Sequence, residues 1–159
     1  VVASMLCAEM VCYYTYLGKT VYRRLCEIYE KYGYVLDKNI SVQYSGLNAM
    51  KEMNAVVDAL KGMKVTSLSP FAVEAVRDYS VPSRTLCATG EVQPIDIPAC
   101  NCVYYELEGG SFVCVRPSGT EPKLKIYYSL RAPDEATAEE KLGELKKSVD
   151  GMLGKAGKN

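Results

Sequence analysis

Residues 102–130 read CVYYELEGGSFVCVRPSGTEPKLKIYYSL and contain three strand patterns separated by two turn sequences. Residues 103–107 alternate between inner apolar and outer side chains, which is typical of a strand with one buried face. Gly109 and Gly110 supply the backbone freedom that a tight turn needs, and residues 112–115 return in a second strand. This part of the chain therefore predicts a β-hairpin.

The third strand pattern follows the second turn sequence, RPSGTEP. In KLKIYYSL (123–130), apolar and polar side chains alternate again, which predicts a half-buried strand with a polar outer face. The predicted inner face carries Leu124, Ile126, Tyr128 and Leu130, and the predicted outer face carries Lys123, Lys125, Tyr127 and Ser129.

Further elements are predicted upstream of the hairpin. Residues 1–17 and 20–32 have the patterns of two helices broken at Gly18, and Gly33 fits the position just past the second helix. Residues 37–45 (DKNISVQYS) are a short strand candidate or a linker.

The remaining elements flank the hairpin. Residues 47–62 repeat apolar side chains every three to four positions and predict a helix. Residues 71–80 predict a strand, whereas residues 81–100, rich in Pro, Thr and Gly, predict a loop. Thr137 and Glu140 have the spacing of a capping box that opens the last helix. Its apolar stripe carries Leu142, Leu145, Val149 and Met152.

The order of these elements predicts the fold class. Strands joined by hairpins and flanked by helices favour an α+β fold, in which helices cover one face of an antiparallel sheet.

Composition narrows the class of protein. The chain has 159 residues, 48% hydrophobic and 24% charged, so it is long enough to bury a core. Lys plus Arg and Asp plus Glu balance at 19 each, which disfavours a nucleic-acid or membrane partner. The absence of histidine excludes His-based catalysis and His–metal sites. The seven cysteines have no framework-like spacing, so we expect reduced thiols and a cytoplasmic location.

The first 18 residues are nearly all apolar, and Glu9 is the only charged residue among them. They lack the basic start and cleavage site of a signal peptide, and they are shorter than the roughly 20 residues of a membrane span. We expect instead a helix that was buried against another part of a larger protein.

The densest chemistry lies in RPSGTEPK (116–123). Arg116 can donate two hydrogen bonds to a phosphate, Ser118 and Thr120 add hydroxyls, and Gly119 allows a tight turn with backbone N–H groups exposed as an anion-binding nest. The segment lacks the GxxxxGK[ST] pattern and precedes a strand, so it is not a Walker A motif. The same composition also suits an ordinary polar turn, and this alternative stays open.

At these residues the chain resembles the α-D-phosphohexomutases, the phosphoglucomutase/phosphomannomutase superfamily. RPSGTEPK is similar to their C-terminal phosphate-binding loop, LEGGSFVCVRPSGTEPKLKIYYS (107–129) extends the match, and GKTVYRRLCEIYEKYGY (18–34) resembles the helical end of their preceding domain. The resemblance implies a four-stranded antiparallel sheet with helices on one face, similar to the TATA-box-binding protein. It also implies a division into residues 1–35 from the third domain, a linker strand and helix at 36–70, and a C-terminal phosphate-binding domain at 71–159. We expect the helix of residues 40–62 to pack on this last domain.

The resemblance further implies a function. The parent enzyme would interconvert hexose 1-phosphate and hexose 6-phosphate through a bisphosphate intermediate, and we expect glucose to be its hexose. The C-terminal domain is a lid that grips the phosphate not being transferred, a role that would fall to Arg116, Ser118, Gly119 and Thr120. Possible supporting residues are Glu121, Lys123 and Lys125, the last at a position where many relatives carry Arg.

The partners implied are a phosphosugar substrate and the other three domains of the parent chain, without nucleic acid or membrane. Mg²⁺ and hexose 1,6-bisphosphate would serve the parent enzyme, and neither would be held by this chain alone. The catalytic serine loop and the carboxylate metal loop of the family do not occur in this sequence, and Ser118 has no predicted base. We therefore expect no catalytic residue here and no activity of the fragment alone.

Two alternatives belong to other functional classes. The chain could be a stand-alone phosphate-binding or protein-interaction module with the same fold. A nucleic-acid binder is disfavoured by the zero net charge and by the absence of tryptophan.

Overall fold

The computed structural model describes residues 1–157 and begins with two helices, as the sequence predicts. Helix α1 spans Val2–Tyr16 and helix α2 spans Val21–Tyr32. Gly18, which separates them, has a φ of 69° that favours glycine, and Gly33 ends α2 with a φ of 90°. Thr20 caps α2, because its side-chain oxygen accepts a hydrogen bond from the backbone N–H of Arg23.

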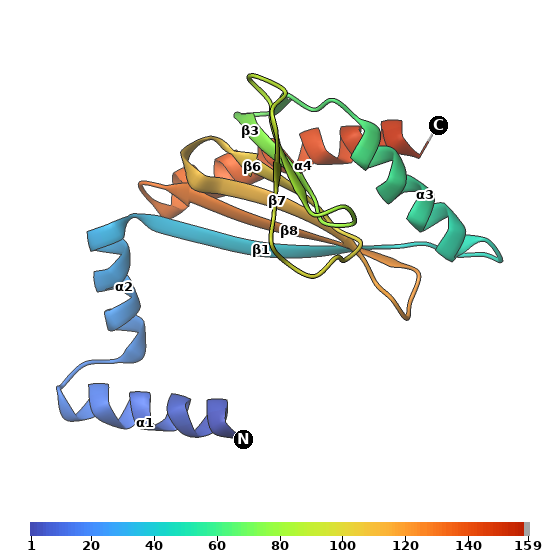
Figure 1. Cartoon of the computed structure of the whole chain (residues 1–159). Helices are drawn as coiled ribbons and strands as arrows, with labels where there is room; N and C mark the ends of the chain where they lie inside the picture. The colour runs from blue at the N-terminus through green and yellow to red at the C-terminus, as the bar shows by residue number, and fades with distance from the viewer. Residues whose placement is uncertain (158–159) are drawn as a thin grey trace.

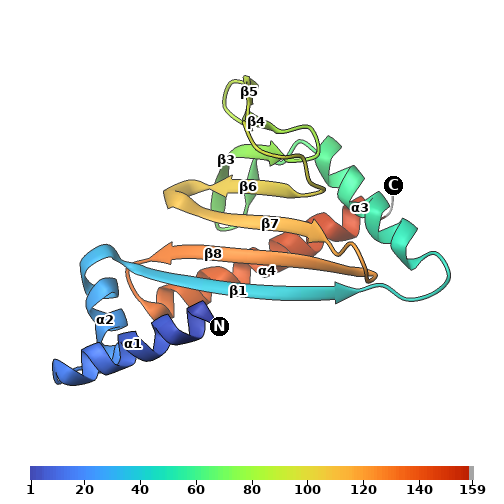
Figure 2. The same ribbon diagram turned by 60° about the horizontal axis from the view of Figure 1, so that its bottom comes forward.

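Within residues 1–157 the sheet contains eight strands, all paired antiparallel. Seven follow the order β1-β8-β7-β6-β3-β4-β5 (Figure 2), and β2 pairs with β3 off this path. The α+β class with an antiparallel sheet is confirmed, but the expected four strands are too few. The strands are β1 Tyr34–Gln43, β2 Ser67–Leu68, β3 Phe71–Asp78, β4 Ser83–Leu86, β5 Val92–Pro94, β6 Val103–Leu107, β7 Ser111–Pro117 and β8 Lys123–Ala132.

The hairpin at the centre of the sheet confirms the pattern in the sequence. Strands β6 and β7 are joined by a single 3₁₀ turn, η1 (Glu108–Gly110), in which Gly109 and Gly110 both have positive φ. Strand β8 then pairs with β7 from Phe112↔Ser129 to Pro117↔Leu124.

The structure confirms one strand prediction and corrects another. The candidate strand at 37–45 is confirmed as far as residue 43, because residues 37–43 lie in β1, a ten-residue strand that pairs along the whole of β8 at the edge of the sheet. The predicted loop at 81–100 contains β4 and β5, which extend the opposite edge. Strand β4 pairs with β3 and β5 pairs with β4, and both strands have four residues or fewer, which is too short for a clear alternation of side chains to show in the sequence.

Helices α3 (Ala49–Gly62) and α4 (Glu135–Ala156) cover one face of the sheet (Figure 2). The predicted stripe of α4 is buried, as are the inner side chains of β6, β7 and β8. The centre of this core is formed by Met53, Leu60, Tyr105, Leu107, Val113, Val115, Ile126, Tyr128, Leu142 and Leu145.

The start of α4 differs from the prediction. Asp134, not Thr137, is the N-cap, and one of its carboxylate oxygens accepts a hydrogen bond of 2.8 Å from the backbone N–H of Thr137. The hydroxyl of Thr137 donates to the other oxygen at 3.0 Å. The capping-box interpretation failed because α4 begins three residues earlier than predicted, where Asp134 is the cap and Thr137 already lies inside the helix.

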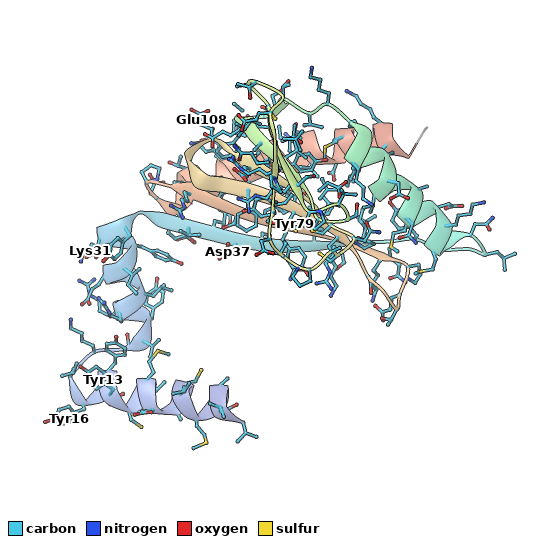
Figure 3. All side chains as sticks on the ribbon, viewed as in Figure 1. Tyr13, Tyr16, Lys31, Asp37, Tyr79 and Glu108 are labelled. Carbon is cyan, nitrogen blue, oxygen red and sulfur yellow. The ribbon has the colours of Figure 1, made fainter. Side chains whose placement is uncertain are left out.

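Helices α1 and α2 extend away from the sheet (Figure 1). No side chain of α1 is buried, and its apolar surface includes Tyr13 and Tyr16, which are labelled in Figure 3. Helix α2 joins the sheet through its C-terminus, where the rings of Tyr29 and Tyr34 lie 4.7 Å apart. Among residues 1–157, no helix combines the length and hydropathy required to cross a bilayer.

Candidate functional site

The loop predicted to bind phosphate connects β7 to β8. It projects from the end of the sheet that is distant from α2 (Figure 1). Its two ends are tied together, because the backbone N–H of Ser118 donates to the carbonyl of Lys123 at 2.8 Å. The backbone N–H of Tyr44 donates to the carbonyl of Pro122 at 2.8 Å and anchors the loop to the chain after β1. The tip of the loop is therefore held on a fixed base.

The candidate donors of this loop are free. Arg116 is exposed and directly opposes Lys125 in the β7–β8 register, and both alternate with buried neighbours, so they lie on the sheet face opposite the helices. Ser118 is half-buried and Thr120 is exposed. Within residues 1–157, no ion pair or side-chain hydrogen bond engages any of these four side chains. A guanidinium, an ammonium and two hydroxyls thus remain available at one end of the sheet.

The two other candidate residues contact each other. The ammonium of Lys123 lies 3.0 Å from a carboxylate oxygen of Glu121. This pair neutralises itself, so Arg116 and Lys125 carry the unpaired positive charge near the loop. An anion is the ligand that such a set of donors and charges favours.

The backbone at Gly119 does not adopt the anion-binding nest that the sequence predicted. No residue from 116 to 123 has a positive φ, so the alternating backbone of an anion-binding nest is not formed. A Cβ atom built on Gly119 would meet nothing within 4 Å. The absent side chain therefore leaves open space at the tip of the loop rather than permitting a special backbone conformation.

A second polar cluster, which the sequence did not reveal, lies on the same open face of the sheet. The guanidinium of Arg84 makes two hydrogen bonds of 2.7 Å to the carboxylate of Glu106, and Arg77 makes a further one. These hydrogen bonds, that of Arg84 first, lower the pKa of Glu106 against the opposing effect of burial. Arg77 also stacks 5.2 Å from the centre of the Tyr104 ring, which itself stacks on Phe112 at 4.7 Å.

The hydroxyl of Ser118 has no side-chain base as hydrogen-bond partner among residues 1–157. In the same residues no three His, Cys, Asp or Glu side chains are grouped to hold a metal ion, so the set does not fit Mg²⁺. The arrangement is suited to holding an anion.

Part of this sequence, including the loop, is similar to known proteins. The sequence model of the family "Phosphoglucomutase/phosphomannomutase, C-terminal domain" matches residues 96–149, which include the whole loop. The chain is 31% identical over 122 residues to a phosphoglucomutase of Staphylococcus saprophyticus, covering 76% of this chain and 22% of that protein. It is 34% identical over 113 residues to a phosphoglucomutase of Staphylococcus haemolyticus, covering 71% of this chain and 20% of that protein.

A solved structure shares the fold. The open form of pp63/parafusin, a phosphoglucomutase from Paramecium, superposes with a TM-score of 0.52 at 12% identity, over 86% of this chain and 23% of that one. The chain thus spans about a fifth of the length of the curated relatives that it matches. It contains a C-terminal domain of the phosphoglucomutase/phosphomannomutase family.

Proposed function

We propose that this chain is the substrate-phosphate-binding lid of a phosphohexomutase that interconverts hexose 1-phosphate and hexose 6-phosphate, with glucose as the preferred hexose. In this proposal Arg116, Ser118, Gly119 and Thr120 hold the phosphate that is not transferred. The single observation that carries it is the free set of donors on the β7–β8 loop, inside the region that matches the family.

The chemistry of the reaction explains why such a loop is useful. A bisphosphate intermediate has to turn end for end between the two half-reactions, so one site must accept a phosphate in either orientation. A guanidinium and hydroxyls recognise a phosphate without reading the sugar attached to it. Movement of the domain over the substrate would exclude water, which favours transfer to the sugar over hydrolysis.

The proposal includes a division of the chain. Residues 1–35 belong to the preceding domain of the parent protein, residues 36–70 connect that domain to the next, and residues 71–159 form the phosphate-binding domain. The exposed apolar surface of α1 supports this, because Val2, Met5 and Leu6 are 71%, 66% and 59% exposed and would be covered by the rest of such a protein. Strand β1 and α3 pack on the same sheet and core, so the connecting segment is part of the phosphate-binding unit in space.

The parent enzyme would supply the remaining chemistry. A phosphoserine would transfer the phosphoryl group and a carboxylate loop would hold Mg²⁺, both outside this chain. The residues here would bind, orient and enclose the substrate, and the fragment alone would be inactive.

The experiment is to replace Arg116 by Ala in the intact protein and to measure turnover of glucose 1-phosphate and mannose 1-phosphate. We expect kcat/KM to fall about 10- to 100-fold, because this is the loss that follows from removing one charge-assisted hydrogen bond to the substrate. Lys147, an exposed lysine on α4, is the control, and Lys147→Ala should retain full turnover. Wild-type turnover by a folded Arg116→Ala protein would contradict the proposal.

Sequencing the gene upstream of this chain tests the alternative of a stand-alone module. An upstream serine loop and carboxylate loop in the same reading frame support the mutase, and a reading frame without them supports the module.

A further inference from the structure

Two cysteines lie in contact beside the loop. Cys102 directly precedes β6 and Cys114 lies in the middle of β7, and their Sγ atoms are 3.3 Å apart. Both are free thiols. Closing a bond of about 2.05 Å between these two sulfurs requires a movement of little more than roughly 1 Å.

We propose that Cys102 and Cys114 are a redox modification site, at which a hydroperoxide converts the two thiols into a reversible disulfide. The site is distinct from the phosphate loop, and the inference does not depend on the proposed function.

The reaction balances with hydrogen peroxide as the oxidant. The thiolate of Cys114 attacks one peroxide oxygen, the O–O bond breaks, and the protein keeps a sulfenic acid while hydroxide leaves and becomes water. The thiolate of Cys102 then attacks Sγ of Cys114, the S–O bond breaks, and a second water leaves. In total two thiols lose two protons and two electrons, and one peroxide becomes two waters.

Exposure assigns the first step to Cys114. Cys114 is half-buried, whereas Cys102 is only 5% exposed, so a small oxidant reaches Cys114 first. The local chemistry agrees, because the hydrogen bond between the two sulfurs, first, and the nearby charge of Arg116 lower the pKa of Cys114 against the opposing effect of burial. The same hydrogen bond and burial raise the pKa of Cys102, which suits the residue that reacts second.

The position of the pair distinguishes it from the other thiols. Cys7 and Cys12 are exposed on α1, and Cys87 contacts the carbonyl of Val65 at 3.6 Å. Among the described residues, the contact between Cys102 and Cys114 is the one sulfur–sulfur contact. Cys102 stands just before β6, and Cys114 lies on β7 two residues before Arg116, so a disulfide would join the start of β6 to β7 near the base of the loop.

The experiment oxidises the fully reduced 159-residue chain with stepwise additions of hydrogen peroxide, at a low protein concentration that limits pairing between molecules. Peptide mapping by mass spectrometry under non-reducing conditions then identifies the products. We expect a Cys102–Cys114 disulfide as the first cross-link, with two fewer free thiols than the seven of the sequence and full recovery after dithiothreitol.

Variants sharpen the test. Cys102→Ser should leave Cys114 without its partner, so that Cys114 accumulates sulfinic acid, whereas the control Cys12→Ser should form the same disulfide as the wild type. The wild-type map needs no variant and remains decisive if Cys102→Ser fails to fold. A first cross-link between Cys100 and either residue, or oxidation confined to exposed thiols while Cys102 and Cys114 stay reduced, would overturn the proposal.

Discussion

Arg116 and Lys125 are direct cross-strand partners in the β7–β8 register, and both side chains are exposed on the open face of the sheet. Two positive charges therefore lie side by side at the base of the loop, with no acidic side chain paired to either in residues 1–157. Directly opposed like charges are unfavourable in an empty site and become favourable when an anion lies between them.

This pairing gives a prediction for Lys125. Lys125→Ala should weaken the binding of inorganic phosphate by about two- to fivefold, since an exposed ammonium acts as a screened point charge. The loss should shrink as salt is added. Lys125→Arg should bind at least as well as the wild type, because a guanidinium can donate two parallel hydrogen bonds. Isothermal titration at two ionic strengths measures both variants, and an equal loss in Lys125→Arg would contradict the assignment.

Gly119 and Gly109 should respond differently to alanine. Gly109 has a φ of 74°, so Gly109→Ala should lower the free energy of unfolding by about 1 kcal/mol. Gly119 has no positive φ and open space at its Cβ, so Gly119→Ala should change stability by less than about 0.5 kcal/mol. Urea unfolding measures both values.

The same Gly119→Ala variant should bind phosphate more weakly, because the added methyl group occupies the space that a ligand would enter at the tip of the loop. Unchanged phosphate affinity would show that ligands do not approach at Gly119.

Glu106 should stabilise the sheet in a pH-dependent way. Glu106→Gln removes the charge that Arg84 and Arg77 share, and should lower the free energy of unfolding by about 1–2 kcal/mol at neutral pH. The pKa of Glu106 is lowered by folding, so this contribution is present above the usual carboxyl pKa of about 4.3 and is lost as the pH falls through the folded-state value. The difference between wild type and variant should therefore narrow in acid.

Glu108 provides the control, since it is exposed at the β6–β7 turn (Figure 3). Glu108→Gln should change the free energy of unfolding by less than about 0.5 kcal/mol at any pH. A constant difference between Glu106→Gln and wild type from neutral pH to below pH 3 would refute the role of this carboxylate.

Tyr105 should tolerate loss of its hydroxyl. The oxygens of Tyr105 and Tyr128 are buried without a hydrogen-bond partner in the described residues, and burial raises the pKa of both phenols. Removing an unsatisfied buried group recovers its desolvation penalty, so Tyr105→Phe should raise the free energy of unfolding by about 1 kcal/mol. Tyr127→Phe, on the outer face of β8, should be close to neutral. Thermal unfolding distinguishes the two, and a destabilised Tyr105→Phe would reveal a partner for this hydroxyl.

The fold could be predicted from sequence where the periodicity is local. Apolar and polar side chains alternate strictly in the hairpin and in β8, and the apolar residues of α4 recur with a helical period. In each of these elements the sequence alone therefore shows which face is buried. Strand β1 could not be assigned with the same certainty, because its identity as an edge comes from its pairing with β8, far along the chain. Strands β4 and β5 have three or four residues each, too few for a pattern to emerge.

The candidate site divides in the same way. The loop donors are adjacent in sequence and could be recognised as a group. The contact between Arg84 and Glu106 spans 22 positions and requires β3 to pair with both β4 and β6. The alternation of β6 predicts that Glu106 lies on the outer face of the sheet. Arg84, however, belongs to a segment predicted as a loop, so no local sequence pattern indicates that these two side chains pair.

The central claim is that the β7–β8 loop binds phosphate through Arg116. The most direct test is an amide NMR titration of the 159-residue chain with inorganic phosphate, in the wild type and in Arg116→Ala. The account predicts saturable shifts centred on residues 116–120 in the wild type, and their loss in a variant whose other resonances are unchanged. Shifts centred elsewhere, or the same affinity in both proteins, would contradict it.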